Sequence, residues 1–184
     1  MSDYNQLRGL QEHNAKLNKI IIESLQQALL LLMEKKDYQK ISITELCQKA
    51  GVSRMAFYTN FETKDNLLES IVKNSNAKLV NRIGSPFRTY VDLKWYITLF
   101  EETKKFAKEL LLIFKAGDSF KYKYITIINN LVLHNPDISE KKRYSRLMWS
   151  GGVVNVIIDW IENGMKTPIE ELANYCLNSF KYLE

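Results

Sequence analysis

The sequence predicts an all-α protein of two domains, and three observations lead to this prediction. Only seven glycines and three prolines interrupt its 184 residues. The stretches between these breaks repeat apolar residues at positions i, i+3 and i+4, which is the spacing of one face of an amphipathic helix. The apolar–polar alternation typical of strands is almost absent. With 46% hydrophobic and 26% charged residues, the composition is that of a folded globular protein.

The first helix is expected over about residues 14–36, where one apolar stripe includes Leu17, Leu25 and Leu29. The residues before it are expected to form a loose arm. A fourth helix, over about 65–83, is expected to act as a connector. The segment "GSPF" then combines glycine with proline, so we expect an N-terminal domain over 1–83 and a C-terminal domain over 84–184. Further helices are predicted at about 88–116, 118–134, 139–164 and 168–183.

Between the first and fourth helices, residues 42–61 predict a helix-turn-helix. Ser42 and Glu45 have the spacing of a capping box, in which the serine oxygen accepts a backbone N–H and the glutamate reaches back. Gly51 is expected to end this helix, because glycine enters a left-handed turn without steric cost. Ser53 is expected to cap the next helix. Two short helices joined by such a turn form a helix-turn-helix.

The second helix of such a motif enters the DNA major groove, so its outward side chains must meet bases and phosphates. Phe57 and Phe61 return at helical spacing and are expected in the core. Arg54 is expected to read guanine through two parallel N–H groups, and Met55 to pack against a thymine methyl group. Lys64 places a positive charge beside the N-terminal N–H groups of the next helix, which suits a phosphate.

The stretch "ISITELCQKAGVSRMAFYTNFETKDNLL" closely resembles the TetR family of bacterial transcription regulators. The resemblance is tight over about 30 residues and looser over the rest of the helical layout. It implies base contacts from Arg54 and Met55, and phosphate contacts from Ser42, Thr44, Ser53, Tyr58, Thr59, Asn60 and Lys64. Many relatives have a small residue at the position of Met55 and histidine or tyrosine at that of Asn60, so the operator sequence is not predicted.

Charge is distributed unevenly along the chain. The net charge is +5, yet residues 1–70 balance to zero and residues 71–125 carry an excess of six positive charges. DNA binding must therefore depend on a few well-placed groups in the first segment rather than on a strongly basic domain. The mid-chain excess is explained more simply by solvated helix faces than by a site for an anionic ligand.

A helix-turn-helix protein usually binds a palindromic operator as a dimer. The segment 147–161 is apolar on two sides, which predicts burial against its own domain and against a second subunit, although both sides could be internal core. In TetR relatives the last two helices form the dimer interface. The predicted dimerisation residues are Trp149, Val153, Ile157, Trp160, Leu172, Cys176 and Phe180.

Aromatic residues crowd the segment 91–133, which predicts either an apolar ligand pocket or an aromatic core. TetR-like regulators commonly bind a small molecule in this domain, and binding releases them from the operator. The predicted pocket residues are Trp95, Phe100, Phe114, Tyr122, Tyr124 and Trp149. The sequence therefore favours a homodimeric repressor with an unidentified effector. The alternative is a TetR-like coactivator or DNA-organising protein whose C-terminal domain binds a protein partner.

Other function classes find little support in the sequence. It contains two histidines and two distant cysteines, so neither a metal site nor a disulfide framework is expected. It contains no nucleophile or phosphate-loop motif, so we do not expect an enzyme or a cofactor beyond a possible effector. The N-terminus does not have the pattern of a signal peptide and no apolar run could span a bilayer, which predicts a cytoplasmic protein without a membrane partner.

Overall fold

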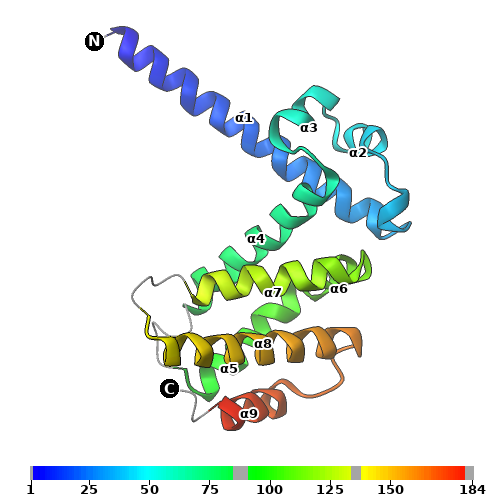
Figure 1. Cartoon of the computed structure of the whole chain (residues 1–184). Helices are drawn as coiled ribbons and strands as arrows, with labels where there is room; N and C mark the ends of the chain where they lie inside the picture. The colour runs from blue at the N-terminus through cyan, green and yellow to red at the C-terminus, as the bar shows by residue number, and fades with distance from the viewer. Residues whose placement is uncertain (1, 85–90, 134–137, 181–184) are drawn as a thin grey trace. The chain divides into compact units, whose positions relative to one another are not determined.

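The structure is a computed structural model, and it describes residues 2–84, 91–133 and 138–180, with side chains from residue 8 onward. The described residues form helices and no strand (Figure 1), which confirms the predicted all-α fold class. The helices are α1 (Ser2–Met33), a short 3₁₀ helix η1 (Tyr38–Lys40), α2 (Ile43–Ala50), α3 (Arg54–Asn60), α4 (Lys64–Ile83), α5 (Leu93–Lys105), α6 (Ala107–Lys115), α7 (Asp118–Val132), α8 (Glu140–Glu162) and α9 (Ile169–Phe180).

The chain divides into two compact units between Ile71 and Val72. This division lies inside α4, whereas the sequence predicted a boundary between residues 83 and 84. The predicted boundary followed the glycine and proline that mark the end of a helix. The observed boundary lies earlier because one continuous helix can contribute side chains to two cores. The remainder of the "GSPF" segment, from residue 85, lies outside the described residues.

The N-terminal unit contains α1 to α3 and the beginning of α4. α1 packs against α2 and α3, and the fully buried side chains include Leu25, Leu29, Leu46 and Phe57. Contrary to the expected loose arm, α1 begins at Ser2, so the arm is helical. Its sequence contains no proline to stop a helix, and polar residues are compatible with an exposed helical turn.

The turn of the helix-turn-helix follows its predicted chemistry. The Ser42 hydroxyl oxygen accepts the backbone N–H of Glu45 at 3.2 Å, and Gly51 has the left-handed conformation with φ of 68°. The second bond of the predicted capping box is different. The Glu45 carboxylate, expected to reach back to the Ser42 backbone N–H, pairs with Lys36. That ion pair joins the chain just after α1 to the first turn of α2. The two short helices are thus fixed by local caps and by one contact from outside the motif.

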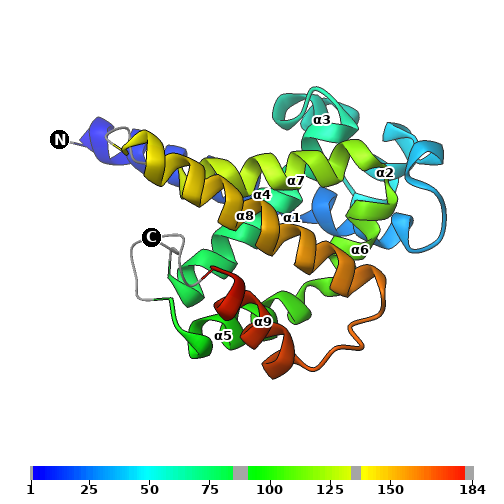
Figure 2. The same ribbon diagram turned by 60° about the horizontal axis from the view of Figure 1, so that its bottom comes forward.

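The C-terminal unit contains the rest of α4 and the helices α5 to α9. α5 lies beside α9 and α7 lies beside α8, while α6 contacts both α7 and α8 (Figure 2). The predicted helix at 88–116 is two helices, since the chain breaks at Phe106 between α5 and α6. The core of this unit is rich in aromatic rings, among them Tyr96, Phe100 and Trp160.

None of the helices in the described part of the chain is long and apolar enough to cross a membrane.

Candidate functional site

The first candidate site is the outward face of α3. Ser53 caps this helix, because its hydroxyl oxygen accepts the backbone N–H of Ala56 at 3.0 Å. Phe57 is fully buried and Phe61 nearly so, and their ring centroids lie 6.0 Å apart. The two rings therefore hold one side of α3 against the N-terminal unit, as their spacing predicted. The opposite side of the helix is left for solvent or a ligand.

Exposed side chains on that opposite side include Arg54, Met55, Tyr58 and Thr59. Met55 is 80% exposed, more than any other large hydrophobic residue that the structure describes. The Arg54 guanidinium carbon lies 6.0 Å from the centre of the Tyr58 ring. This contact tethers the arginine near the start of the helix while its N–H groups stay available. The Arg54 guanidinium, the Met55 thioether and the Tyr58 phenol thus lie on one short exposed surface.

The smaller predicted contact residues are also placed by local bonds. The Thr59 hydroxyl donates to the Met55 carbonyl and the Asn60 amide donates to the Ala56 carbonyl, each at 2.9 Å. Thr59 is exposed and Asn60 is half-buried. Ser42 and Thr44, at the start of α2, are exposed as well. All nine predicted DNA contacts therefore have at least part of their surface in solvent, and the eight other than Lys64 lie on or beside α2 and α3.

Lys64 occupies a different environment from the other eight. Its ammonium group donates to the carbonyl oxygens of Tyr38 and Ile41, at 2.7 Å each, and lies 4.2 Å from the centre of the Tyr38 ring. Partial burial lowers the pKa of the Lys64 amine from its usual value. The side chain thus ties the segment before α2 to the first turn of α4. A contact between Lys64 and a phosphate stays a prediction, whereas its hydrogen bonds to the two carbonyl oxygens stabilise the N-terminal unit itself.

Sequence comparison agrees with this geometry. Residues 27–71 match the profile described as "Bacterial regulatory proteins, tetR family", and residues 93–182 match a profile described as "Transcriptional regulator C-terminal region". The chain belongs to the TetR family. It is therefore a transcriptional regulator with a DNA-binding helix-turn-helix domain, and the predicted family and fold are confirmed.

Two curated proteins are similar to this chain. "Uncharacterized HTH-type transcriptional regulator YxbF" of Bacillus subtilis is 29% identical over 79 residues, which cover 41% of this chain and 21% of YxbF. "HTH-type dhaKLM operon transcriptional activator DhaS" of Lactococcus lactis is 25% identical over 137 residues, which cover 74% of this chain and 71% of DhaS. The chain thus spans only about a fifth of YxbF but most of DhaS.

Solved structures share the fold. A TetR transcriptional regulator from Streptococcus agalactiae has a TM-score of 0.64 and 15% identity, covering 92% of this chain and 98% of its own. The dihydroxyacetone kinase operon activator DhaS has a TM-score of 0.61 and 19% identity, and the match covers 88% of this chain and 94% of the DhaS chain. At this identity the likeness concerns the fold alone.

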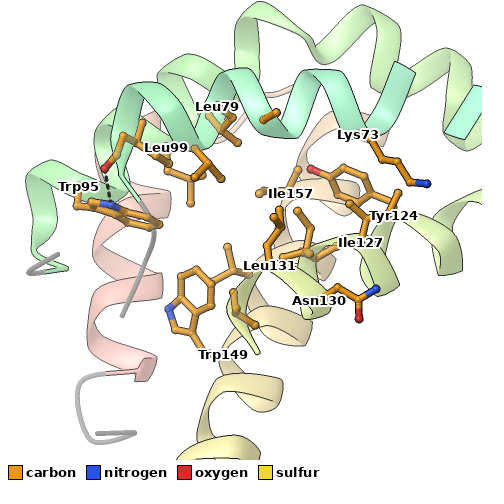
Figure 3. Close-up of a pocket in the computed structure, with 17 residues that line it drawn as sticks. Lys73, Leu79, Trp95, Leu99, Tyr124, Ile127, Asn130, Leu131, Trp149 and Ile157 are labelled. Carbon is orange, nitrogen blue, oxygen red and sulfur yellow. Dashed lines mark hydrogen bonds between the residues drawn. The ribbon is translucent and has the colours of Figure 1, made fainter. Parts of the chain in front are cut away.

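The second candidate site is a cavity of about 520 Å³ inside the C-terminal unit. It is lined by α4, α5, α7 and α8, and Figure 3 shows its walls. Of the six predicted pocket residues, Trp95, Tyr124 and Trp149 line it. Phe100 and Phe114 are buried but do not line it, and Tyr122 is 72% exposed, so these three differ from the prediction. Aromatic composition alone does not separate a cavity wall from a core ring.

Lys73 and Asn130 line the same cavity and were missed from the sequence. Lys73 belongs to α4, which was predicted only as a connector, and its charge was attributed to a solvated helix face. Asn130 follows the aromatic run of α7 and carries no distinctive pattern. The excess positive charge of the segment 71–125 was the one available signal, and it could not say which lysine lies at a cavity.

The predicted dimerisation residues lie mostly in the interior of their own chain. Six of the seven, which are Trp149, Val153, Ile157, Trp160, Leu172 and Cys176, are buried inside their own chain. Little of their surface is exposed, although Trp160, Leu172 and Cys176 line a groove beside α8 and α9. Both apolar stripes of α8 lie largely in the interior because α8 packs against α6 and α7 on one side and meets Phe180 of α9 on another. Phe180 remains partly exposed.

Proposed function

We propose that this TetR-family protein is a homodimeric repressor that binds a palindromic operator and is released from it by a small molecule. The observation that carries the proposal is the outward face of α3, where Arg54 and Met55 are exposed on a helix whose other side is anchored by Phe57. A recognition helix needs this arrangement, because its side chains must reach base edges while its backbone stays fixed.

The residues of this face have complementary roles in the proposal. Arg54 donates two N–H groups to the O6 and N7 atoms of a guanine, and Met55 contacts a thymine methyl group. The hydroxyl and amide groups of the neighbouring residues donate to phosphate oxygens and set the register of the helix on the duplex. The residues assigned to phosphates are Ser42, Thr44, Ser53, Tyr58, Thr59 and Asn60. Lys64 supports them by holding the segment before α2.

Pairing of two subunits is assigned to the outer surfaces of α8 and α9. Tyr144, Met148 and Tyr175 are large apolar or aromatic residues that are at least half exposed on these helices. A groove of about 480 Å³, lined by residues of α8 and α9 and of the segment between them, lies beside Tyr175. Exposed apolar groups around such a groove support a protein contact. The groove is lined in part by four of the residues that the sequence indicated, which are Trp160, Leu172, Cys176 and Phe180.

The cavity in the C-terminal unit supports a small-molecule effector. Its volume falls within the range of sites for ligands of drug size, and its walls are mostly apolar. A regulator that acted only by recruiting a protein would not need this space. The activator named DhaS shows that a similar chain can act in the positive sense, so the test must report the sign of regulation as well as the binding.

The test begins with selection of bound sequences from a random duplex library by the purified protein at near-physiological salt. We expect a palindrome whose half-sites lie about one helical turn apart, roughly 34–36 Å. Anisotropy titration should then give two chains per duplex. A reporter gene placed behind the selected site should be repressed when the protein is expressed.

Two further outcomes decide details of this proposal. Arg54→Ala should lose about 1–3 kcal/mol of binding free energy, with the loss concentrated at one base pair of each half-site. Recovery of no motif from folded protein would contradict the operator-binding function. Activation of the reporter would leave DNA recognition intact but overturn the repressor assignment.

A further inference from the structure

The polar groups of the cavity in the C-terminal unit are arranged unevenly. At the aromatic wall, the Trp95 indole N–H donates to the Ile83 carbonyl at 3.0 Å, and the Trp149 indole N–H donates to the Tyr96 hydroxyl at 2.7 Å. Both indole N–H groups are thus engaged within the protein. A ligand beside these rings meets only apolar and aromatic surface, which suits a hydrocarbon body.

The hydroxyl of Tyr124 is different. Tyr124 is 2% exposed and lines the cavity, and its hydroxyl has no hydrogen-bond partner among the described residues. Figure 3 shows its oxygen pointing toward the interior of the cavity. Burial raises the pKa of this phenol, so it stays protonated and able to donate at neutral pH. Because this hydroxyl faces the cavity, a ligand oxygen placed there can accept its hydrogen bond.

The mouth of the cavity carries a positive charge. Lys73 and Asn130 are exposed lining residues, and Figure 3 places them with Tyr124 on the side away from Trp95 and Trp149. Within residues 2–84, 91–133 and 138–180, no aspartate or glutamate lines the cavity and no carboxylate forms an ion pair with Lys73. Among the lining residues that the structure describes, Lys73 alone is charged. The site therefore favours a negative group and disfavours a positive one.

We propose that the cavity binds an organic monocarboxylate with an apolar body. The body lies against the Trp95 and Trp149 rings, and the carboxylate lies at the mouth, where Lys73 and Asn130 donate to it. The Tyr124 hydroxyl donates to a ligand oxygen from inside. This assignment rests on the proposed function, because it names the class of effector that the regulator would sense. A cationic amphiphile would meet Lys73 without a compensating acid, and a neutral alkyl chain would leave Lys73 unused.

The test compares three probes with the same ten-carbon chain: decanoate, decan-1-ol and decylammonium, each below its aggregation concentration. Binding to the full chain in the absence of DNA is followed by tryptophan fluorescence, since Trp95 and Trp149 line the cavity. We expect decanoate to bind at least about fivefold more tightly than either of the other two probes, as one exposed ion pair allows.

The matched variants are Lys73→Met and Lys78→Met. Lys78 is exposed on the same helix but does not line the cavity. Lys73→Met should weaken decanoate binding about fivefold and leave decan-1-ol binding unchanged, while Lys78→Met should change neither. Circular dichroism of each variant confirms that it is folded.

Several results would overturn the assignment. They are equal affinity for decanoate and decan-1-ol, tighter binding of decylammonium, equal losses in the two lysine variants, or binding of none of the probes by folded protein. The library selection described above is done without any probe. A protein that binds decanoate but selects no DNA motif would thus refute the proposed function alone, and the reverse result would refute the ligand class alone.

Discussion

At the scale of single residues, Lys64 shows how one side chain can serve a site without lying on its surface. Replacing it by methionine removes two charge-assisted hydrogen bonds, those to the carbonyl oxygens of Tyr38 and Ile41, although the Tyr38 carbonyl still accepts the backbone N–H of Ile41. We expect Lys64→Met to lower the free energy of unfolding by about 1–3 kcal/mol. Thermal and urea denaturation followed by circular dichroism would measure this.

Lys40→Met is the matched control for that prediction. The Lys40 ammonium pairs with Asp37 at an exposed position, 2.8 Å away, so its loss should leave the free energy of unfolding nearly unchanged. If Lys64→Met keeps full stability but weakens all DNA sequences equally, the lysine acts on phosphate and not on the fold.

Tyr124 and Tyr96 form a second matched pair. Tyr124→Phe removes a hydroxyl that faces the cavity and bonds to none of the described residues, so we expect little change in the free energy of unfolding. Tyr96→Phe removes the acceptor of the Trp149 indole N–H, so we expect a loss of about 1–3 kcal/mol. Urea denaturation monitored by tryptophan fluorescence checks both. A loss of stability in Tyr124→Phe would show that this hydroxyl is bonded inside the protein.

At the scale of elements, two adjacent glycines in α8 have different surroundings. A Cβ atom at Gly152 would lie 2.4 Å from the ring of Phe180, whereas nothing lies within 4 Å of one at Gly151. Gly151→Ala should therefore stabilise the helix by about 0.5–1 kcal/mol. Gly152→Ala should lose this gain and cost about 1–3 kcal/mol more, because the ring must move.

Thermal denaturation of the two glycine variants decides between these expectations. Equal stabilisation by both would mean that the Phe180 ring moves aside freely. Destabilisation by Gly151→Ala alone would indicate that a second subunit covers Gly151 in solution, in agreement with the proposed pairing surface.

The elements also show which parts of the fold were predictable. Helix ends at Ser42, Gly51 and Ser53 depend on hydrogen bonds and φ angles within a few residues, so the sequence predicted them correctly. The break at Phe106 has no glycine or proline to mark it and was missed. Apolar periodicity in α8 predicted burial on two sides, but it could not distinguish the chain's own core from the surface of a partner.

The same limit applies to the candidate sites. The exposed face of α3 was predictable because the caps fix its ends and the spacing of Phe57 and Phe61 fixes its inward side. The cavity was not, because Tyr122 and Tyr124 differ only by two positions in α7, and one is exposed while the other is buried. Lys73 lies at the cavity because helices distant in sequence pack beside α4, and no local sequence pattern records that packing.

At the scale of the whole molecule, the distribution of charge predicts how DNA binding responds to salt. Residues 1–70 have no net charge, so affinity should come from specific phosphate contacts rather than from a diffuse basic surface. Each phosphate neutralised by a lysine or arginine releases counterions, so affinity for the selected operator should fall at least about tenfold between 50 and 200 mM salt. Anisotropy titrations at several salt concentrations measure the slope. An affinity indifferent to salt would contradict binding through the phosphate backbone.

The positions of tryptophan and cysteine give the molecule a set of internal reporters. All three tryptophans, Trp95, Trp149 and Trp160, lie in the C-terminal unit, so their emission records the unfolding of that unit alone. Each unit has one buried cysteine, Cys47 in the first and Cys176 in the second, and burial raises the pKa of both thiols, to about 11 for Cys176. A thiol reagent can reach either sulfur only when its unit opens. Labelling rates at the two cysteines, identified by peptide mass, would therefore report whether the N-terminal and C-terminal units open together or one at a time. No engineered probe is needed.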